Sequence, residues 1–282
     1  MTQRNRSQGW QHAKRSGHRN EDALHDLLLQ DRDYQSDFLR RLGAEGSRIA
    51  QAEVGGIRET DVPSLLPGRT KSKTDLRLLL DSGEEYRISI KKSLSGQVYL
   101  IRDTRFLQGM CLQYGIPIPS EVERAIRLFW GSADDLDQLL PRYATRPAYE
   151  RRKHRLTADS LYGLDPALSG TLPVWFSEHA GLVADLCFSR GLAARPEDWA
   201  SHIWYKNTLG ENPVDRLIPI SRLCRLAQAA APERTCYGRA GGGTTIQLPF
   251  GFVQWHQGQM QFHHRYKDIA ALLDDAPERL PL

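Results

Sequence analysis

Two neighbouring apolar runs carry the residues with the most evident chemical potential. Asp75 comes directly before residues 76–80, and Ser89 and Lys91 lie at the end of residues 86–91. A carboxylate beside a lysine can hold a divalent cation and an attacking water together, an arrangement suited to phosphodiester hydrolysis. The alternative is an ordinary hairpin with a surface Asp and a surface Lys, and these residues taken alone favour it.

A hairpin is the simplest element that brings these residues together. Residues 76–80 and 86–90 alternate in the period of half-buried β-strands. Between them, Asp81-Ser-Gly-Glu supplies a residue that tolerates positive φ at Gly83. The two strands therefore reverse direction there, and the pairing places Asp75 near Lys91.

Composition sets broad limits. The 282 residues suffice for one large domain or two small ones, with 40% apolar and 26% charged residues. No run approaches the roughly 20 apolar residues of a membrane span, and the N-terminus lacks the apolar core of a secretory signal. We therefore expect a cytoplasmic protein.

The cysteines favour neither a disulfide framework nor zinc. They are far apart in sequence, without a CxxC pair, and we expect reduced thiols. Cys224 and Cys236, followed by His256, His263 and His264, match no tight zinc pattern.

Basic residues are concentrated locally, although the net charge is only +4. Residues 1–20 carry no acid, residues 142–155 have a single Glu, and the long loop 55–72 is also basic. Such segments suit a polyanion, while a disordered tail or a solvated helix face is an equally good explanation. The candidate DNA-contacting residues here are Arg69, Lys71, Lys73, Arg151, Arg152 and Lys153.

Periodicity and capping residues predict the other elements. Asn20 can cap a helix with Glu21 in its first turn, and Ser120 with Glu123 resembles a capping box. Residues 97–101 predict a third strand that extends the hairpin's sheet. Further helices are predicted at 33–42, 106–114, 120–130, 173–190, 220–231 and 266–273, and further strands at 47–54, 202–206 and 216–220.

The stretch from Tyr237 to Lys267 is rich in long polar side chains on β-like strands. Glutamine amides can contact an adenine edge, and arginine can read guanine or hold phosphate, although glutamine is also common on exposed strands. Gly241–Gly243 lacks the Lys-Ser/Thr ending of a P-loop and can be a simple turn. The candidate DNA-binding residues here are Arg239, Gln247, Gln254, Gln259, Gln261, His263, His264 and Arg265.

The order of Glu21 on an early helix, Asp75 opening a strand and Ser89-Ile-Lys91 on the next resembles the PD-(D/E)xK nuclease superfamily. The resemblance covers roughly residues 15–102, and Ser89 stands where an acid is usual. Some restriction endonucleases of this type have Ser or Thr there and take the missing carboxylate from elsewhere. Glu21 is the best donor in this chain, with Glu53 and Glu123 as weaker candidates.

The resemblance implies an α/β (α+β) fold with a central mixed sheet of the restriction-endonuclease type, flanked by helices. It implies Mg²⁺ bound by Asp75, Glu21 and the carbonyl of Ile90, with Lys91 orienting the water. We predict a basic arm at 1–20 and a single nuclease domain at 21–282. This domain divides into a catalytic core (21–102), a helical region (103–200) and a β-rich recognition region (201–275).

The function most consistent with this resemblance is that of a type II restriction endonuclease acting on double-stranded DNA as a homodimer. A modification-dependent or phage-defence nuclease is an alternative with the same chemistry. A sequence-specific DNA-binding protein with an inactive core is an alternative from another class, and it is motivated by Ser89.

Overall fold

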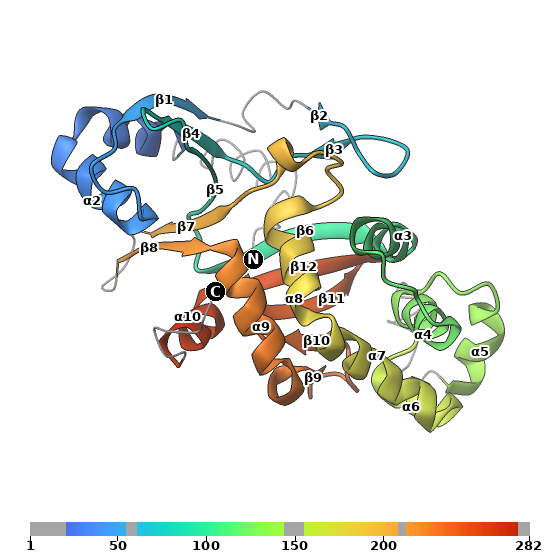
Figure 1. The fold of residues 1–282 in the computed structure, drawn as a ribbon. Helices are drawn as coiled ribbons and strands as arrows, with labels where there is room; N and C mark the ends of the chain where they lie inside the picture. Colours follow the sequence, from blue (N-terminus) through green and yellow to red (C-terminus); the bar gives the residue numbers. More distant parts are fainter. Residues whose placement is uncertain (1–20, 55–60, 144–154, 208–212, 276–282) are drawn as a thin grey trace, which may run out of the picture. The chain divides into compact units, whose positions relative to one another are not determined.

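The computed structural model describes residues 21–54, 61–143, 155–207 and 213–275 (Figure 1). The chain forms two compact units, each assembled from separated segments. The first unit comprises Met1–Pro63, Arg69–Ser93 and Ser189–Ile220. The second comprises Ser64–Gly68, Leu94–Phe188 and Ser221–Leu282.

A five-stranded mixed sheet forms the centre of the first unit, in the order β1-β4-β5-β7-β8. Only the β5–β7 pair is parallel among these neighbours, so the predicted mixed sheet is confirmed. Two short strands, β2 and β3, pair with each other in the same unit, which also contains a 3₁₀ turn, η3. The bounds are β1 Ile49–Val54, β2 Asp61–Val62, β3 Thr70–Lys71, β4 Leu76–Leu80, β5 Glu85–Lys91, η3 Pro196–Asp198, β7 His202–Asn207 and β8 Val214–Pro219.

One face of this sheet packs against two helices. The helix of residues 21–30 and α2 (Arg32–Leu42) bury Leu24, Leu28 and Phe38 against it. Alternate residues of β4 and β5, such as Leu76 and Ile88, are fully buried in the same cluster. The predicted helix at 33–42 and the predicted hairpin are confirmed, and Gly83 closes the turn with φ +85°.

The carboxylate of Asp215 on β8 accepts hydrogen bonds from side chains of both α2 and β7, and so joins α2 to the sheet. Tyr34 Oη donates to Asp215 Oδ2 at 2.6 Å, and Arg41 Nη1 and Trp204 Nε1 each donate to Oδ1 at 2.9 Å. Lys206 Nζ also donates to this carboxylate. Burial alone would raise the pKa of Asp215, but these donors outweigh burial and hold the pKa below its usual range.

The second unit contains a separate five-stranded antiparallel sheet, in the order β6-β12-β11-β10-β9. The strand predicted at 97–101 belongs here, because β6 pairs with β12. The prediction that it extends the hairpin's sheet was wrong, since β4 and β7 already occupy both sides of β5. The bounds are β6 Ser95–Arg102, β9 Cys236–Tyr237, β10 Thr245–Leu248, β11 Gly251–His256 and β12 Gln259–Arg265.

Helices make up most of the sequence between β6 and β7, and two more helices, α9 and α10, follow later in the chain. The predicted helices at 106–114 and 120–130 are confirmed, but the one at 173–190 begins earlier and is interrupted at His179. None of the helices in the described ranges is long and apolar enough to cross a membrane. The bounds are α3 Asp103–Tyr114, α4 Ser120–Trp130, α5 Leu136–Tyr143, α6 Ala158–Leu164, α7 Pro166–Glu178, α8 Ala180–Asp185, η2 Leu186–Arg190, α9 Ile220–Arg234 and α10 Tyr266–Asp274.

The predicted capping box of α4 was wrong. Pro119 occupies the N-cap, so Ser120 is already the first helical residue and its side chain does not cap. Glu123 instead pairs with Arg127 at 2.8 Å, one turn further along the helix.

The glycine run at 241–243 is an ordered turn. All three residues are left-handed, with φ between +69° and +74°. The carbonyls of Gly242 and Gly243 accept from the backbone N–H groups of Asp159 and Ala158, both at 3.2 Å. The run therefore caps the N-terminus of α6, where unpaired N–H groups need acceptors.

We predict that Asp215→Asn lowers the free energy of unfolding by about 2–4 kcal/mol at pH 7, because Lys206 and Arg41 lose their carboxylate partner. A depressed pKa contributes stability that is present above the unfolded value of about 4 and is lost as pH falls through the folded value. The deficit of the variant should therefore shrink in acid. Urea unfolding between pH 7 and pH 3 measures this, with the exposed Glu45→Gln as control; a deficit that does not change with pH contradicts it.

We predict that Gly243→Ala destabilises the second unit by about 2–4 kcal/mol. An added Cβ would lie 2.4 Å from the Cβ of Ala158, in addition to the cost of φ +74°. Gly258→Ala is the matched control, because φ is +76° there and nothing lies within 4 Å of the added atom. Equal losses of unfolding free energy in the two variants would refute a role for close packing at residue 243.

Candidate active site

Asp75 lies where β4 begins, and its side chain takes the place of a backbone partner. Its N–H donates to the carbonyl of Ile88 at 2.9 Å. Its Oδ2 accepts the backbone N–H of Ile90 at 2.7 Å and the hydroxyl of Ser89 at 3.2 Å. The carboxylate is thereby held at the end of the hairpin by the opposite strand.

Lys91 completes a chain of polar contacts with these groups. Its Nζ donates to Ser89 Oγ at 2.6 Å and lies 3.9 Å from Asp75 Oδ2. Ser89 is 1% exposed, whereas the side chains of Lys91 and Asp75 are 19% and 26% exposed. A buried hydroxyl therefore links a lysine and a carboxylate that both reach the surface, and the predicted proximity of Asp75 and Lys91 is confirmed.

Strand geometry places the carbonyl of Ile90 on the side of Asp75. The N–H and C=O of one residue in a strand point to the same side, and the N–H of Ile90 points to Asp75. Among the described residues, no hydrogen-bond donor lies on Asp75 Oδ1. A carboxylate and a carbonyl oxygen are the hard ligands that Mg²⁺ prefers, so these groups fit the predicted cation.

The third predicted ligand, Glu21, stays a prediction. It lies in the helix of residues 21–30, whose Leu24 and Leu28 cover the sheet face that holds Ile88 and Ile90. Strand alternation directs Ser89 and Lys91 to the other face. The described residues contain no group of three His, Cys, Asp or Glu side chains able to hold a metal. The geometry therefore supports two oxygen ligands from the hairpin itself.

The parallel strand β7 brings residues to the hairpin that sequence reasoning missed. Ser89 lies opposite Ile203, and Lys91 lies opposite Tyr205. Tyr205 is fully buried, next to the end of β5 that carries Lys91. His202, on the same strand, is on the opposite face, where burial lowers its pKa to about 4 and keeps the ring neutral at pH 7.

The predicted DNA-contacting cations have different surroundings. Arg69 is 84% exposed on the β2–β3 loop and pairs with Asp61 at 3.0 Å. Lys71 and Arg239 are exposed, and Lys73 is partly buried. Residues 151–153, with Arg151, Arg152 and Lys153, lie outside the described residues. Contact of these residues with DNA stays a prediction.

Most of the predicted polar strand residues lie together in the second unit. Gln259, Gln261, His263 and Arg265 alternate along β12 on one face. His264 was wrongly included, because it lies on the opposite face with 2% exposure and contacts Phe188. A buried ring in that position cannot reach a base edge.

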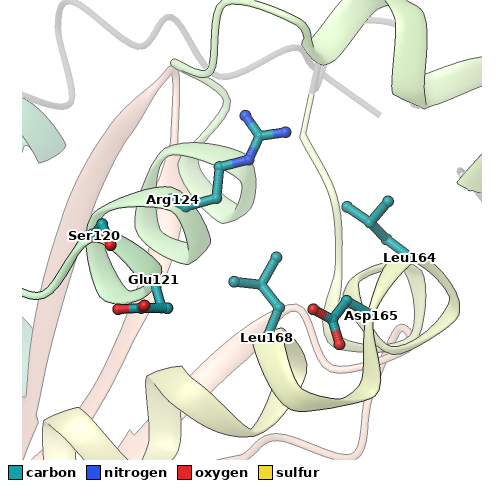
Figure 2. A pocket seen from close by; sticks show the side chains of 6 residues that line it. All are labelled: Ser120, Glu121, Arg124, Leu164, Asp165 and Leu168. Carbon is teal, nitrogen blue, oxygen red and sulfur yellow. The ribbon is translucent and has the colours of Figure 1, made fainter.

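A shallow hollow in the second unit is a less suitable site. Figure 2 shows it between α4 and the start of α7, lined by Ser120, Glu121, Arg124, Leu164, Asp165 and Leu168, with a volume of about 540 Å³. Arg124 is paired with Asp135 at 2.6 Å, and Asp165 caps α7. Arg124 and Asp165 thus have structural partners, and the hollow includes none of the predicted site residues.

Comparisons with known proteins identify no family. No family model and no curated protein matches the chain. Among solved structures, it is similar to the restriction endonuclease MspI in complex with its cognate DNA, at 13% identity and a TM-score of 0.45, over 86% of this chain and 87% of that one. A likeness of this extent does not assign an activity.

Proposed function

We propose that this chain is a Mg²⁺-dependent endonuclease that hydrolyses phosphodiester bonds in double-stranded DNA, of the type II restriction class. The observation that carries the proposal is the Asp75–Ser89–Lys91 chain at the end of the hairpin, with the Ile90 carbonyl alongside. A cation ligand and an ammonium group within 4 Å of each other suit attack of water on a phosphate.

Each residue has a distinct role in this proposal. Asp75 Oδ1 and the Ile90 carbonyl would hold the cation, which lowers the pKa of a bound water and offsets charge on the phosphate. Lys91 would donate to the attacking water or to a phosphate oxygen. Ser89 positions Lys91, because a 2.6 Å hydrogen bond restricts a side chain with many rotamers.

Homodimerisation and sequence specificity belong to the same proposal. Two copies would place one site on each strand of a two-fold symmetric sequence. The second candidate, an inactive DNA-binding protein, is favoured by one observation: Ser89 supplies a hydroxyl where a second carboxylate would strengthen cation binding.

We predict that the purified protein with Mg²⁺ cuts plasmid DNA into discrete fragments. Asp75→Asn and Lys91→Ala should each lower the cleavage rate at least about 100-fold, because each removes a group that acts at the phosphate. Lys92→Ala is the matched control, since Lys92 is exposed and lies just beyond the end of β5.

The outcomes separate the candidates. Discrete fragments from Asp75→Asn at the wild-type rate contradict the proposed site. Binding without cleavage under every divalent cation supports the inactive DNA-binding protein. Cleavage confined to methylated DNA supports a modification-dependent nuclease.

We also predict that Ser89→Asp tightens Mg²⁺ binding at least about 5-fold in calorimetric titration without DNA, because cation affinity rises with the number of charged ligands. Ser89→Asn is the control of equal size without the charge. If both variants bind Mg²⁺ equally, the cation does not lie beside residue 89.

A further inference from the structure

The sheet of the second unit has one covered face and one polar face. Ile246, Val253, Met260 and Phe262 are fully buried on the covered face, and Phe262 packs on Phe106 of α3 at 5.6 Å between ring centroids. In Figure 1, α7, α8 and α9 lie in front of these strands. The other face is therefore the one available to a partner.

Strand pairing defines this second surface, here called the open face. Residues that pair directly across strands share a face, and Leu100, which pairs with Gln261, is 36% exposed on it. Among these described strand residues, none is an aspartate or a glutamate. The open face consists of Ser95, Gln97, Leu100 and Arg102 on β6, Gln259, Gln261, His263 and Arg265 on β12, Phe252, Gln254 and His256 on β11, and Thr245 and Gln247 on β10.

Three glutamines on the open face form a relay across three strands. Gln261 Nε2 donates to Gln97 Oε1 at 2.6 Å, and Gln254 Nε2 donates to Gln261 Oε1 at 2.8 Å. The relay ends 3.2 Å from His263 Nε2. Gln97 and Gln261 each keep an N–H for a partner, whereas both N–H groups of Gln254 are engaged and its Oε1 remains available. Their side chains are already ordered, which reduces the entropy that binding would cost.

The neighbouring row of the open face is equally fixed. The ring of His263 stacks on Phe252, with centroids 4.6 Å apart and planes 3° apart. The Arg265 guanidinium lies over the same Phe252 ring at 5.4 Å and donates to Gln247 Oε1 at 2.7 Å. Arg265 also pairs with Asp268 at 2.6 Å, so Arg102 is the cation on the face whose contacts with DNA would matter most for salt dependence.

We propose that the open face binds double-stranded DNA and that the relay of Gln97, Gln261 and Gln254 reads base edges. The strand residues of this face include amides and cations but no carboxylate of their own, a composition complementary to a polyanion and unsuited to a basic partner. A primary amide presents a donor and an acceptor side by side, which matches the N6 and N7 edge of adenine in the major groove. The choice of DNA among polyanions rests on the proposed function.

The test measures binding in the absence of cleavage. Full-length protein in EDTA is titrated into labelled duplex DNA, and bound duplexes from a random pool are sequenced. The double variant Gln254→Met and Gln261→Met keeps side-chain length but removes both amides. It should bind the selected sequence at least about 10-fold more weakly and lose adenine preference at the positions read.

Two further variants sharpen the test. Gln138→Met, at an exposed position on α5, is the matched control and should bind like the wild type. Arg102→Gln should weaken binding to all sequences alike and reduce the salt dependence of affinity by about one ion. Circular dichroism checks that each variant is folded; if the double variant is not, Gln254→Met alone takes its place.

Several results would overturn the inference. Unchanged affinity and sequence preference in the relay variant would do so, as would tighter binding of the wild type to single-stranded DNA or to RNA, or no binding to duplex DNA at all. A wild type that binds duplex DNA through this face but never cleaves it contradicts the proposed nuclease activity and leaves the open face in place.

Discussion

The hydrogen bond from the Ile90 N–H to Asp75 Oδ2 is the contact on which the candidate site depends. At this point β4 begins, so β5 has a backbone group without a strand partner. A carboxylate fills that position and is thereby fixed relative to the next strand. Because buried backbone groups must be satisfied, the need for a hydrogen bond in the fold also positions the acid. The same contact sets the direction of the Ile90 carbonyl.

The first sheet adds a second constraint through its one parallel pair. β5 is bounded by β4 on one side and by β7 on the other, and β7 comes from more than a hundred residues further along the chain. Both edges of β5 are therefore paired, and β6, which follows Lys91 in the chain, pairs with β12 in the other sheet. The hairpin of β4 and β5 and the polar strands thus belong to different units, although they are linked by only a few residues between β5 and β6.

Sequence patterns predicted those structural features that depend on residues close together in the chain. The alternation in 76–80 and 86–90, with Gly83 between them, was sufficient for the hairpin and for the proximity of Asp75 and Lys91. Tyr205 could not be predicted beside Lys91, because parallel pairing over a long separation leaves no local signal. Gln97 was missed because its partner Gln261, on an antiparallel strand, is distant in sequence. His264 was a different error, since the period of two already assigned it to the face opposite His263.

The hydroxyl of Ser89 also determines the electrostatic balance of the site. Asp75 and Lys91 carry opposite charges 3.9 Å apart, so the pair is neutral as a whole. A site with a second carboxylate would be negative until a cation arrived and would repel a phosphate. This one would present no such barrier, and a bound divalent cation would leave it with a net positive charge. An incoming DNA backbone would then meet an attractive field, at the cost of a weaker hold on the cation itself.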